Sequence, residues 1–161
     1  MRAGFSNNGK VPREIERKFL LKQLPPNLRQ FHNRTIEQGY LAAKCDGTQI
    51  RLRNAGRHYS LTIKRGRGIS RQEIEIDLTR DQFEELWPAT AGCRLTKTRY
   101  DVPLGRHTIE IDIYRGRNEG LVVAEVEFPN EQQCKRFQPP DWFAAEVSGK
   151  SRYSNVRLAR E

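Results

Sequence analysis

Acidic and basic side chains recur at every second residue along much of this chain. The acidic pairs are Glu14 and Glu16, Glu73 and Glu75, Glu110 and Asp112, and Glu125 and Glu127, and the basic residues are Lys18, Arg51, Arg53, Lys64, Lys97 and Arg99. Carboxylate oxygens suit Mg²⁺ or Mn²⁺ rather than zinc. Arginine and lysine bind phosphate oxygens, arginine through its bidentate fork. A metal-bound polyphosphate would satisfy both sets of charges.

Extended strands are the elements that would place such residues together, because residues i and i+2 share one face of a strand. Ile74 and Ile76, for example, alternate with the acids around them. The alternation predicts eight strands, over residues 14–21, 35–42, 49–54, 58–65, 71–78, 94–104, 107–115 and 121–128. Helices are expected over 79–87 and 131–137, and a further helical turn over 142–147.

A solvated sheet face is the simplest interpretation of alternating charge on any single strand. The set as a whole is harder to explain in that way. Seven of the eight predicted strands carry charge opposite their aliphatic face, and each charged face is mostly of one sign. About eight short strands indicate a barrel or a sandwich. If the charged faces converge inside a closed barrel, the crowded like charges require a compensating ligand.

Composition narrows the class of partner. The chain has 161 residues, a net charge of +9 and a pI of about 9.8, which favours an anionic partner. Nucleic acid is not expected, because the bases alternate with aliphatic residues and not with aromatic stacking platforms. No apolar run approaches a membrane span. The three well-separated cysteines, Cys45, Cys93 and Cys134, suggest neither a disulfide framework nor a zinc site, and they favour a cytoplasmic location.

The order and spacing of these residues resemble the CYTH superfamily, the triphosphate tunnel metalloenzymes, in its small bacterial branch. Glu14-x-Glu16-x-Lys18 matches the N-terminal signature, the later charged pairs agree strand by strand, and the ending from Glu146 to Asn155 also looks like this branch. The resemblance covers residues 14–157. It implies a mainly β (α+β) fold, a closed eight-stranded antiparallel barrel with a few flanking helices, as a single domain over residues 14–161 after a loose leader at 1–13.

The resemblance also implies metal-dependent hydrolysis of a triphosphate and allows roles to be assigned. Phosphate oxygens would be bound by Lys18, Arg51, Arg53, Lys64, Lys97 and Arg99, and Mg²⁺ or Mn²⁺ by Glu14, Glu16, Asp112, Glu125 and Glu127. The catalytic candidates are Glu73, Glu75, Lys97 and Glu110, with the three glutamates supporting the metal ligands or holding a second ion. Which carboxylate activates the attacking water stays open.

Inorganic tripolyphosphate is the favoured substrate, because a short chain offers few candidates for a pocket that would hold an organic group. Nucleoside triphosphates are weaker candidates. Adenylate cyclase, thiamine triphosphatase and a non-catalytic polyphosphate-binding module remain alternatives, and a homodimer is a further expectation. Where the branch usually carries an acid after its glycine, this chain has Lys150. Gly149-Lys150-Ser151 looks like the end of a P-loop, but the first glycine of that motif would fall on Ala144.

Overall fold

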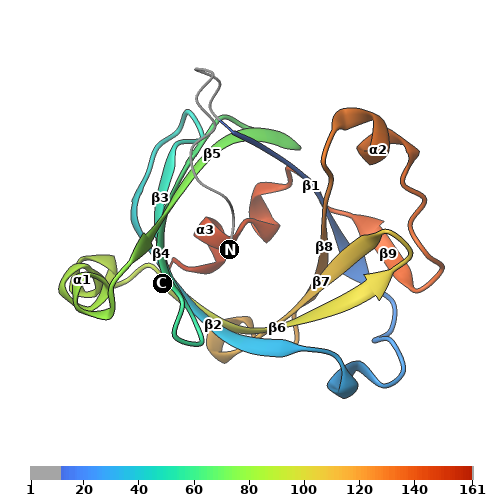
Figure 1. Cartoon of the computed structure of the whole chain (residues 1–161), viewed down its shortest axis with the longest axis horizontal. Coiled ribbons are helices and arrows are strands. Elements are labelled where there is room, and N and C mark those ends of the chain that lie inside the picture. The colour runs from blue at the N-terminus through green and yellow to red at the C-terminus, as the bar shows by residue number, and fades with distance from the viewer. Residues whose placement is uncertain (1–11, 161) are drawn as a thin grey trace.

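A closed antiparallel barrel dominates the computed structural model, which describes residues 12–160 (Figure 1). Its strands are β1 (Arg13–Leu21), β2 (Asn33–Ala43), β3 (Gln49–Ala55), β4 (Tyr59–Arg65), β5 (Ser70–Leu78), β6 (Arg94–Leu104), β7 (His107–Tyr114), β8 (Val122–Glu127) and β9 (Phe143–Glu146). Neighbours follow the order β5-β4-β3-β2-β6-β7-β8-β1-β9, and a pairing of β5 with β1 closes the ring. The eight-stranded closed barrel expected from the sequence is therefore confirmed.

Short helices flank the ring. They are α1 (Arg80–Leu86), α2 (Glu131–Arg136) and α3 (Asn155–Leu158), with 3₁₀ turns η1 (Leu28–Gln30), η2 (Trp87–Thr90), η3 (Gly116–Asn118) and η4 (Ser151–Tyr153). Thr79 begins α1 as predicted: its side chain accepts the N–H of Gln82, and the Gln82 side chain accepts the N–H of Thr79. Residues 1–13, the expected leader, lie outside the described residues except for the last two, and Arg13 already belongs to β1.

The helical turn predicted over residues 142–147 is wrong, because Phe143–Glu146 forms β9. This strand pairs with β1 at Phe19 and Leu21. The aromatic ring of Phe143 packs on that of Phe19, with centroids 4.9 Å apart. Pairing with the open edge of β1 and a buried aromatic contact determine the conformation of this segment. These tertiary contacts outweigh the local sequence preference for a helical turn.

Aliphatic residues cover the outside of the barrel, and the main core lies between its wall and the elements packed on it. Phe19, Ile111 and Val126 are almost fully buried there, beneath α2 and β9. Each buried side chain of this kind contributes about 1.5–3 kcal/mol to folding. On the opposite side Phe83 of α1 packs against Tyr59 of β4, with ring centroids 5.0 Å apart. Charged residues are thereby left on the inner face.

The C-terminal segment, residues 148–160, crosses one end of the barrel, and α3 lies within the outline of the ring in Figure 1. Asn118 donates to the carbonyl of Leu158 at 2.9 Å, and the Tyr114 hydroxyl donates to the side chain of Asn155. Cys93 and Arg160 form an isolated antiparallel bridge. These contacts tie the segment to the start of β6 and to the β7–β8 connection, so this end of the barrel is partly covered.

The state of the cysteines and the apolar character of the helices bear on two expectations from composition. All three cysteines are free thiols. Within residues 12–160, no helix has the length and apolar character that crossing a membrane would require.

Candidate active site in the barrel tunnel

One cavity of about 520 Å³ runs through the inside of the barrel; we call it the tunnel. Twelve of the predicted site residues line it: Glu14, Glu16, Lys18, Arg51, Arg53, Lys64, Glu73, Glu75, Arg99, Glu110, Glu125 and Glu127. They come from seven different strands. The alternation of charged and aliphatic residues therefore places the charged faces inside. The volume lies within the range of about 300–1,000 Å³ that is typical of ligand sites.

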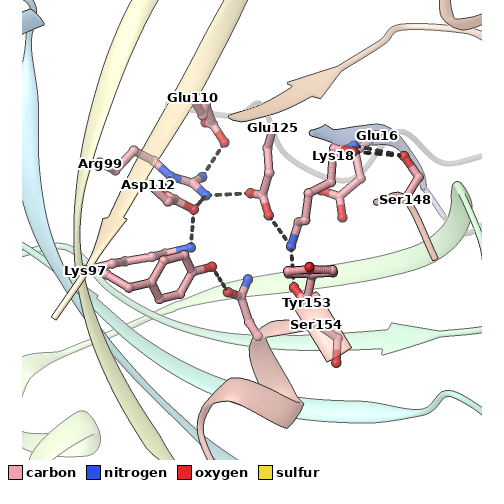
Figure 2. Close-up of polar contacts among 12 residues, drawn as sticks. Glu16, Lys18, Lys97, Arg99, Glu110, Asp112, Glu125, Ser148, Tyr153 and Ser154 are labelled. Carbon is pink, nitrogen blue, oxygen red and sulfur yellow. Dashed lines mark hydrogen bonds and ion pairs between the residues drawn. The ribbon is translucent and has the colours of Figure 1, made fainter. Parts of the chain in front are cut away.

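Lys97 and Asp112 are the two predicted site residues that do not line the tunnel. Both side chains are fully buried, with Lys97 Nζ 2.5 Å from Asp112 Oδ2. Burial lowers the pKa of Lys97 to about 8, although Asp112 opposes this shift. Burial alone would favour the protonated form of Asp112, but Arg99 and then Lys97 lower the pKa of this carboxyl. The pair lies in the wall behind Arg99 (Figure 2).

Arg99 connects this buried pair to the tunnel. Its guanidinium donates to Asp112 Oδ1 and Oδ2, each at 2.6 Å, and to Glu125 Oε2 at 2.6 Å. It also pairs with Glu110. Glu125 receives a second cation, Lys18, at 2.6 Å (Figure 2). Although burial disfavours its charge, Lys18, Lys97 and Arg99 hold the pKa of Glu125 well below its usual range. The carboxylate is therefore charged at neutral pH.

A second network lies across the tunnel on β1, β4 and β5. Lys64 Nζ is 2.7 Å from Glu14 and 3.0 Å from Glu73, and Arg71 is 2.7 Å from Glu16 and 3.2 Å from Glu14. Burial and then the nearby charge of Glu125 raise the pKa of Glu16. Negative charge is therefore crowded on β1 and β8, even with two cations close by.

Arg53 is different, because its guanidinium makes no hydrogen bond or ion pair with any residue among 12–160. Its Nε is buried without a partner. Burial, followed by the charges of Arg51 and Arg99, lowers its pKa to about 10, so it remains protonated at neutral pH. Arg51 beside it donates to Thr62 Oγ1 at 3.0 Å and lies 3.7 Å from Glu75. An unpaired, partly buried guanidinium next to two others favours binding of an anion.

Comparison with known proteins agrees with this geometry. Residues 12–155 match the CYTH domain. The chain belongs to the CYTH domain family. It is 44% identical over 148 residues to an inorganic triphosphatase of Nitrosomonas europaea, covering 91% of this chain and 96% of that protein. It is 33% identical over 155 residues to an inorganic triphosphatase of Acetivibrio thermocellus, covering 92% and 94%.

Solved structures show the same CYTH barrel. A crystal structure of an inorganic triphosphatase superimposes with a TM-score of 0.67 at 41% identity, covering 92% of this chain and 95% of that one. A putative adenylate cyclase from Bacillus halodurans has a TM-score of 0.51 at 13% identity, covering 76% and 83%. At that identity the second likeness concerns the fold alone.

Several tunnel residues of this CYTH chain lie outside the predicted set of site residues. Arg71 precedes Glu73 by two residues, so the same alternation places it on the inner face of β5 and could have identified it. Tyr40, which lines the tunnel from β2, accepts a hydrogen bond from Gln38 at 3.1 Å. Lys18 donates to the backbone carbonyl of Tyr153 at 3.3 Å. No periodic signal marks this last contact, because it comes from the irregular C-terminal segment.

The donor chemistry of the tunnel fits a divalent metal ion. Glu16 and Glu127 are directly paired across β1 and β8, and Glu125 lies two residues before Glu127. Carboxylates placed opposite one another repel, and hard oxygen donors in such a cluster suit Mg²⁺ or Mn²⁺. Among residues 12–160, no group of three or more His, Cys, Asp or Glu side chains already has a metal-holding arrangement. In this structure Lys18 pairs with Glu125 and Arg71 pairs with Glu16.

Proposed function

We propose that this CYTH protein hydrolyses a triphosphate in the tunnel, with inorganic tripolyphosphate as the preferred substrate and Mg²⁺ or Mn²⁺ as the metal. The observation that carries the proposal is the guanidinium of Arg53, which pairs with no residue among 12–160 and lies near Arg51 and Arg99 in a cavity of ligand size. Both relatives are named inorganic triphosphatases, and they are 44% and 33% identical to this chain. Their names support the same reaction class.

Phosphoryl transfer depends mainly on positioning and on neutralising the phosphate oxygens. We assign this role to the tunnel cations Lys18, Arg51, Arg53, Lys64 and Arg99, each of which lines the cavity. Lys97 has no access to the cavity in this structure, so we assign it and Asp112 a positioning role. They hold Arg99 from behind through two hydrogen bonds from Arg99 to Asp112.

Glu14, Glu16, Glu125 and Glu127 would hold the metal, with Glu73, Glu75 and Glu110 close by for support or for a second ion. When bound, the ion supplies charge neutralisation of the phosphate and a lowered pKa of a coordinated water. The protein's own contribution is to orient the substrate between two charged walls. Asp112, a predicted metal ligand, directs its oxygens to Lys97 and Arg99 in this structure, and we assign it no direct contact with the ion.

An inorganic substrate fits the lining better than an organic triphosphate does. A nucleotide or thiamine group requires an apolar or aromatic surface beside the phosphates. The tunnel offers few such residues, chiefly Tyr40, Ile69, Val147, Tyr153 and Val156, among many charged side chains. Cyclase and thiamine triphosphatase activities are therefore the less favoured alternatives.

Phosphate release from tripolyphosphate, ATP and thiamine triphosphate tests the proposal. The protein is first freed of metal with a chelator and then supplied with Mg²⁺ or Mn²⁺. We expect no release without metal and the highest kcat/KM with tripolyphosphate. Undiminished activity in the chelator would overturn the metal requirement. A ligand-induced melting shift without phosphate release would favour the non-catalytic binding module, and production of cyclic nucleotide from ATP would favour the cyclase.

A further inference from the structure

Arg17 lies between two tunnel residues of β1, yet its own side chain is on the outer face of the barrel. Glu16 and Lys18 line the tunnel, and the alternation of the strand turns the residue between them to the other side. The side chain of Arg17 is only 16% exposed there. The function proposed above gives this mostly buried cation no role.

The guanidinium of Arg17 joins β1 to two elements packed on the outside of the barrel. It forms a bidentate pair with Glu146 of β9, from Nε to Oε1 at 2.9 Å and from Nη2 to Oε2 at 2.7 Å. Its Nη1 donates to the carbonyls of Cys134 in α2 and of Phe137 just after it, each at 3.2 Å. It also lies over the ring of Phe19, 5.0 Å from the centroid. The hydrogen bond from Arg17 lowers the pKa of Glu146, so this carboxylate is charged at neutral pH.

Ser148 links Glu146 to the backbone of Lys18. The Ser148 hydroxyl donates to Glu146 Oε1 at 2.7 Å. The same hydroxyl accepts the backbone N–H of Lys18 at 2.9 Å (Figure 2). The backbone N–H of Val147 donates to the carbonyl of Lys18 at 2.8 Å. A continuous chain of hydrogen bonds therefore runs from the outer face to a tunnel residue, through Arg17, Glu146, Ser148 and Lys18; we call it the relay.

Lys18 lies where one edge of β1 changes its neighbour. The pairing with β5 covers residues Arg13–Ile15, and the Glu16 N–H still donates to the carbonyl of Ile69 at 3.1 Å. Pairing with β9 begins only at Phe19. The backbone of Lys18 therefore falls in the gap between two strands, and the relay supplies the partners that a strand would otherwise provide.

The side chain of Lys18 depends on the same segment. Its Nζ lies 2.6 Å from Glu125 and donates to the backbone carbonyl of Tyr153 at 3.3 Å. Tyr153 follows Ser148 in the chain, after a turn in which Gly149 has a φ of 70°. A shift of the turn at Ser148 would therefore move a backbone partner and a side-chain partner of Lys18 together.

We propose that Arg17 is a positioning residue for triphosphate binding: from outside the barrel, and through Glu146 and Ser148, it holds the Lys18 ammonium where the phosphate is bound. The inference rests on the proposed function, which assigns Lys18 to the phosphate oxygens. A cation that is already in place binds its anion without further ordering of the side chain or the segment. Loss of the relay would loosen Lys18 without removing any charged group from the tunnel.

Steady-state kinetics on tripolyphosphate at saturating metal test the relay with Arg17→Gln, Ser148→Ala and the double variant. We expect each single change to raise KM roughly three- to tenfold, which corresponds to the loss of one hydrogen bond. The value of kcat should change by less than about twofold, because the lost binding is shared by ground state and transition state. The double variant should have the KM of a single variant, since the two residues act in series. Ser148→Thr keeps the hydroxyl and should keep the parent KM.

The matched control is Arg34→Gln. Arg34 forms a partly buried ion pair with Asp101 at 2.5 Å and does not line the tunnel. The control should keep the parent KM whatever its effect on Tm. A parent KM in Arg17→Gln, with only a lower Tm, would overturn the proposal and leave Arg17 with a structural role. Additive effects of Arg17→Gln and Ser148→Ala on KM would also overturn it, in favour of direct contact between Ser148 and the substrate.

Hydrogen exchange at the backbone N–H of Lys18 is a second readout, which does not depend on activity. Its acceptor is the Ser148 hydroxyl. Relative to exchange at the buried Ile111 in the same variant, exchange at Lys18 should become roughly fivefold faster in Arg17→Gln and stay at the parent value in Arg34→Gln. Unchanged exchange in Arg17→Gln would contradict the link to Lys18. If the parent releases no phosphate, the proposed function fails, and calorimetric Kd values for tripolyphosphate in the same variants still decide the role of Arg17.

Discussion

The carboxylate of Asp112 balances two cations inside the barrel wall, and its removal should cost the protein much of its stability. Asp112 and Lys97 have no exposed side-chain surface, and that of Arg99 is 5% exposed. Asp112→Asn preserves the size and removes the charge that accepts from Lys97 at 2.5 Å and twice from Arg99 at 2.6 Å. Removing one partner of a buried ion pair typically costs about 3–5 kcal/mol.

Lys97 limits this loss, because it can release its proton. Deprotonating a lysine of ordinary pKa at pH 7 costs about 5 kcal/mol. Burial has already lowered the pKa of Lys97 to about 8. Most of that penalty is therefore present in the parent, and Lys97 adds only about 1–2 kcal/mol after the substitution. Arg99 cannot lose its proton, and the loss of one of its three carboxylate partners raises the total to about 3 kcal/mol.

Urea unfolding and melting curves would measure this change, which corresponds to a fall in Tm of roughly 6–12 °C for a domain of this size. The control is Glu110→Gln, since Glu110 pairs with the same Arg99 but has a side chain that is 32% exposed; we expect a loss of less than about 1 kcal/mol. A loss of similar size for Asp112→Asn would refute the reasoning.

The pH dependence of the difference gives an independent check. In the variant, the unfolded chain binds a proton at Lys97 that the folded state has released, so its stability rises with pH. The folded parent releases the same proton only above a pKa of about 8. The part of the difference that is due to Lys97 should therefore narrow as pH rises from about 6 and disappear above about 8. A difference that is constant over this range would show that Lys97 keeps its charge in the variant.

Three further predictions follow from the tunnel. Arg53→Gln should lower kcat/KM for tripolyphosphate about tenfold or more by removing a charge-assisted phosphate contact, and an unchanged kcat/KM would contradict this. The same change should not lower the Tm of the free protein, because Arg53 has no partner to lose within residues 12–160. Calorimetric titration should show that Mg²⁺ lowers the Kd of tripolyphosphate at least about fivefold and that tripolyphosphate lowers the Kd of Mg²⁺ by the same factor. Kd values that do not depend on the other ligand would contradict this prediction. Gly47→Ala should lower the free energy of unfolding by at least about 1 kcal/mol more than Gly56→Ala does. Both glycines have positive φ, but of the two only Gly47 faces the backbone of another loop. Equal melting curves for the two variants would count against contact between the β2–β3 and β4–β5 loops.

The inner and outer faces of the strands could be predicted from the sequence, because alternation depends only on the period of an extended chain. The alternation of Ile74 and Ile76 with Glu73, Glu75 and Asp77 separates the two faces of β5. Closure of the barrel could not be derived from one strand at a time. It depends on the pairing of β5 with β1 at Arg13 and Ile15, which joins strands more than fifty residues apart.

The depth of each side chain in the barrel wall could not be predicted by the same reasoning. Lys97 and Arg99 share one face of β6, yet only Arg99 lines the tunnel. Asp112 and Glu110 share one face of β7, yet only Glu110 does. Tilt and stagger of the strands, together with the bulk of Tyr114 beside Lys97, decide which residue is covered. These features arise from packing between strands, and no single-strand pattern contains them.

Neutralisation inside the tunnel is the other feature that the strand pattern did not indicate. Acids and bases segregate by strand in the sequence, which favours two separate ligand sets. In the folded barrel neighbouring strands bring the sets together, and six interior cations face seven carboxylates: Lys18, Arg51, Arg53, Lys64, Arg71 and Arg99 against Glu14, Glu16, Glu73, Glu75, Glu110, Glu125 and Glu127. A triphosphate alone would therefore meet repelling carboxylates, and a metal ion alone would meet repelling cations. Each ligand relieves the repulsion that opposes the other, so the pairing of acids and bases inside the tunnel also favours joint binding of metal and triphosphate.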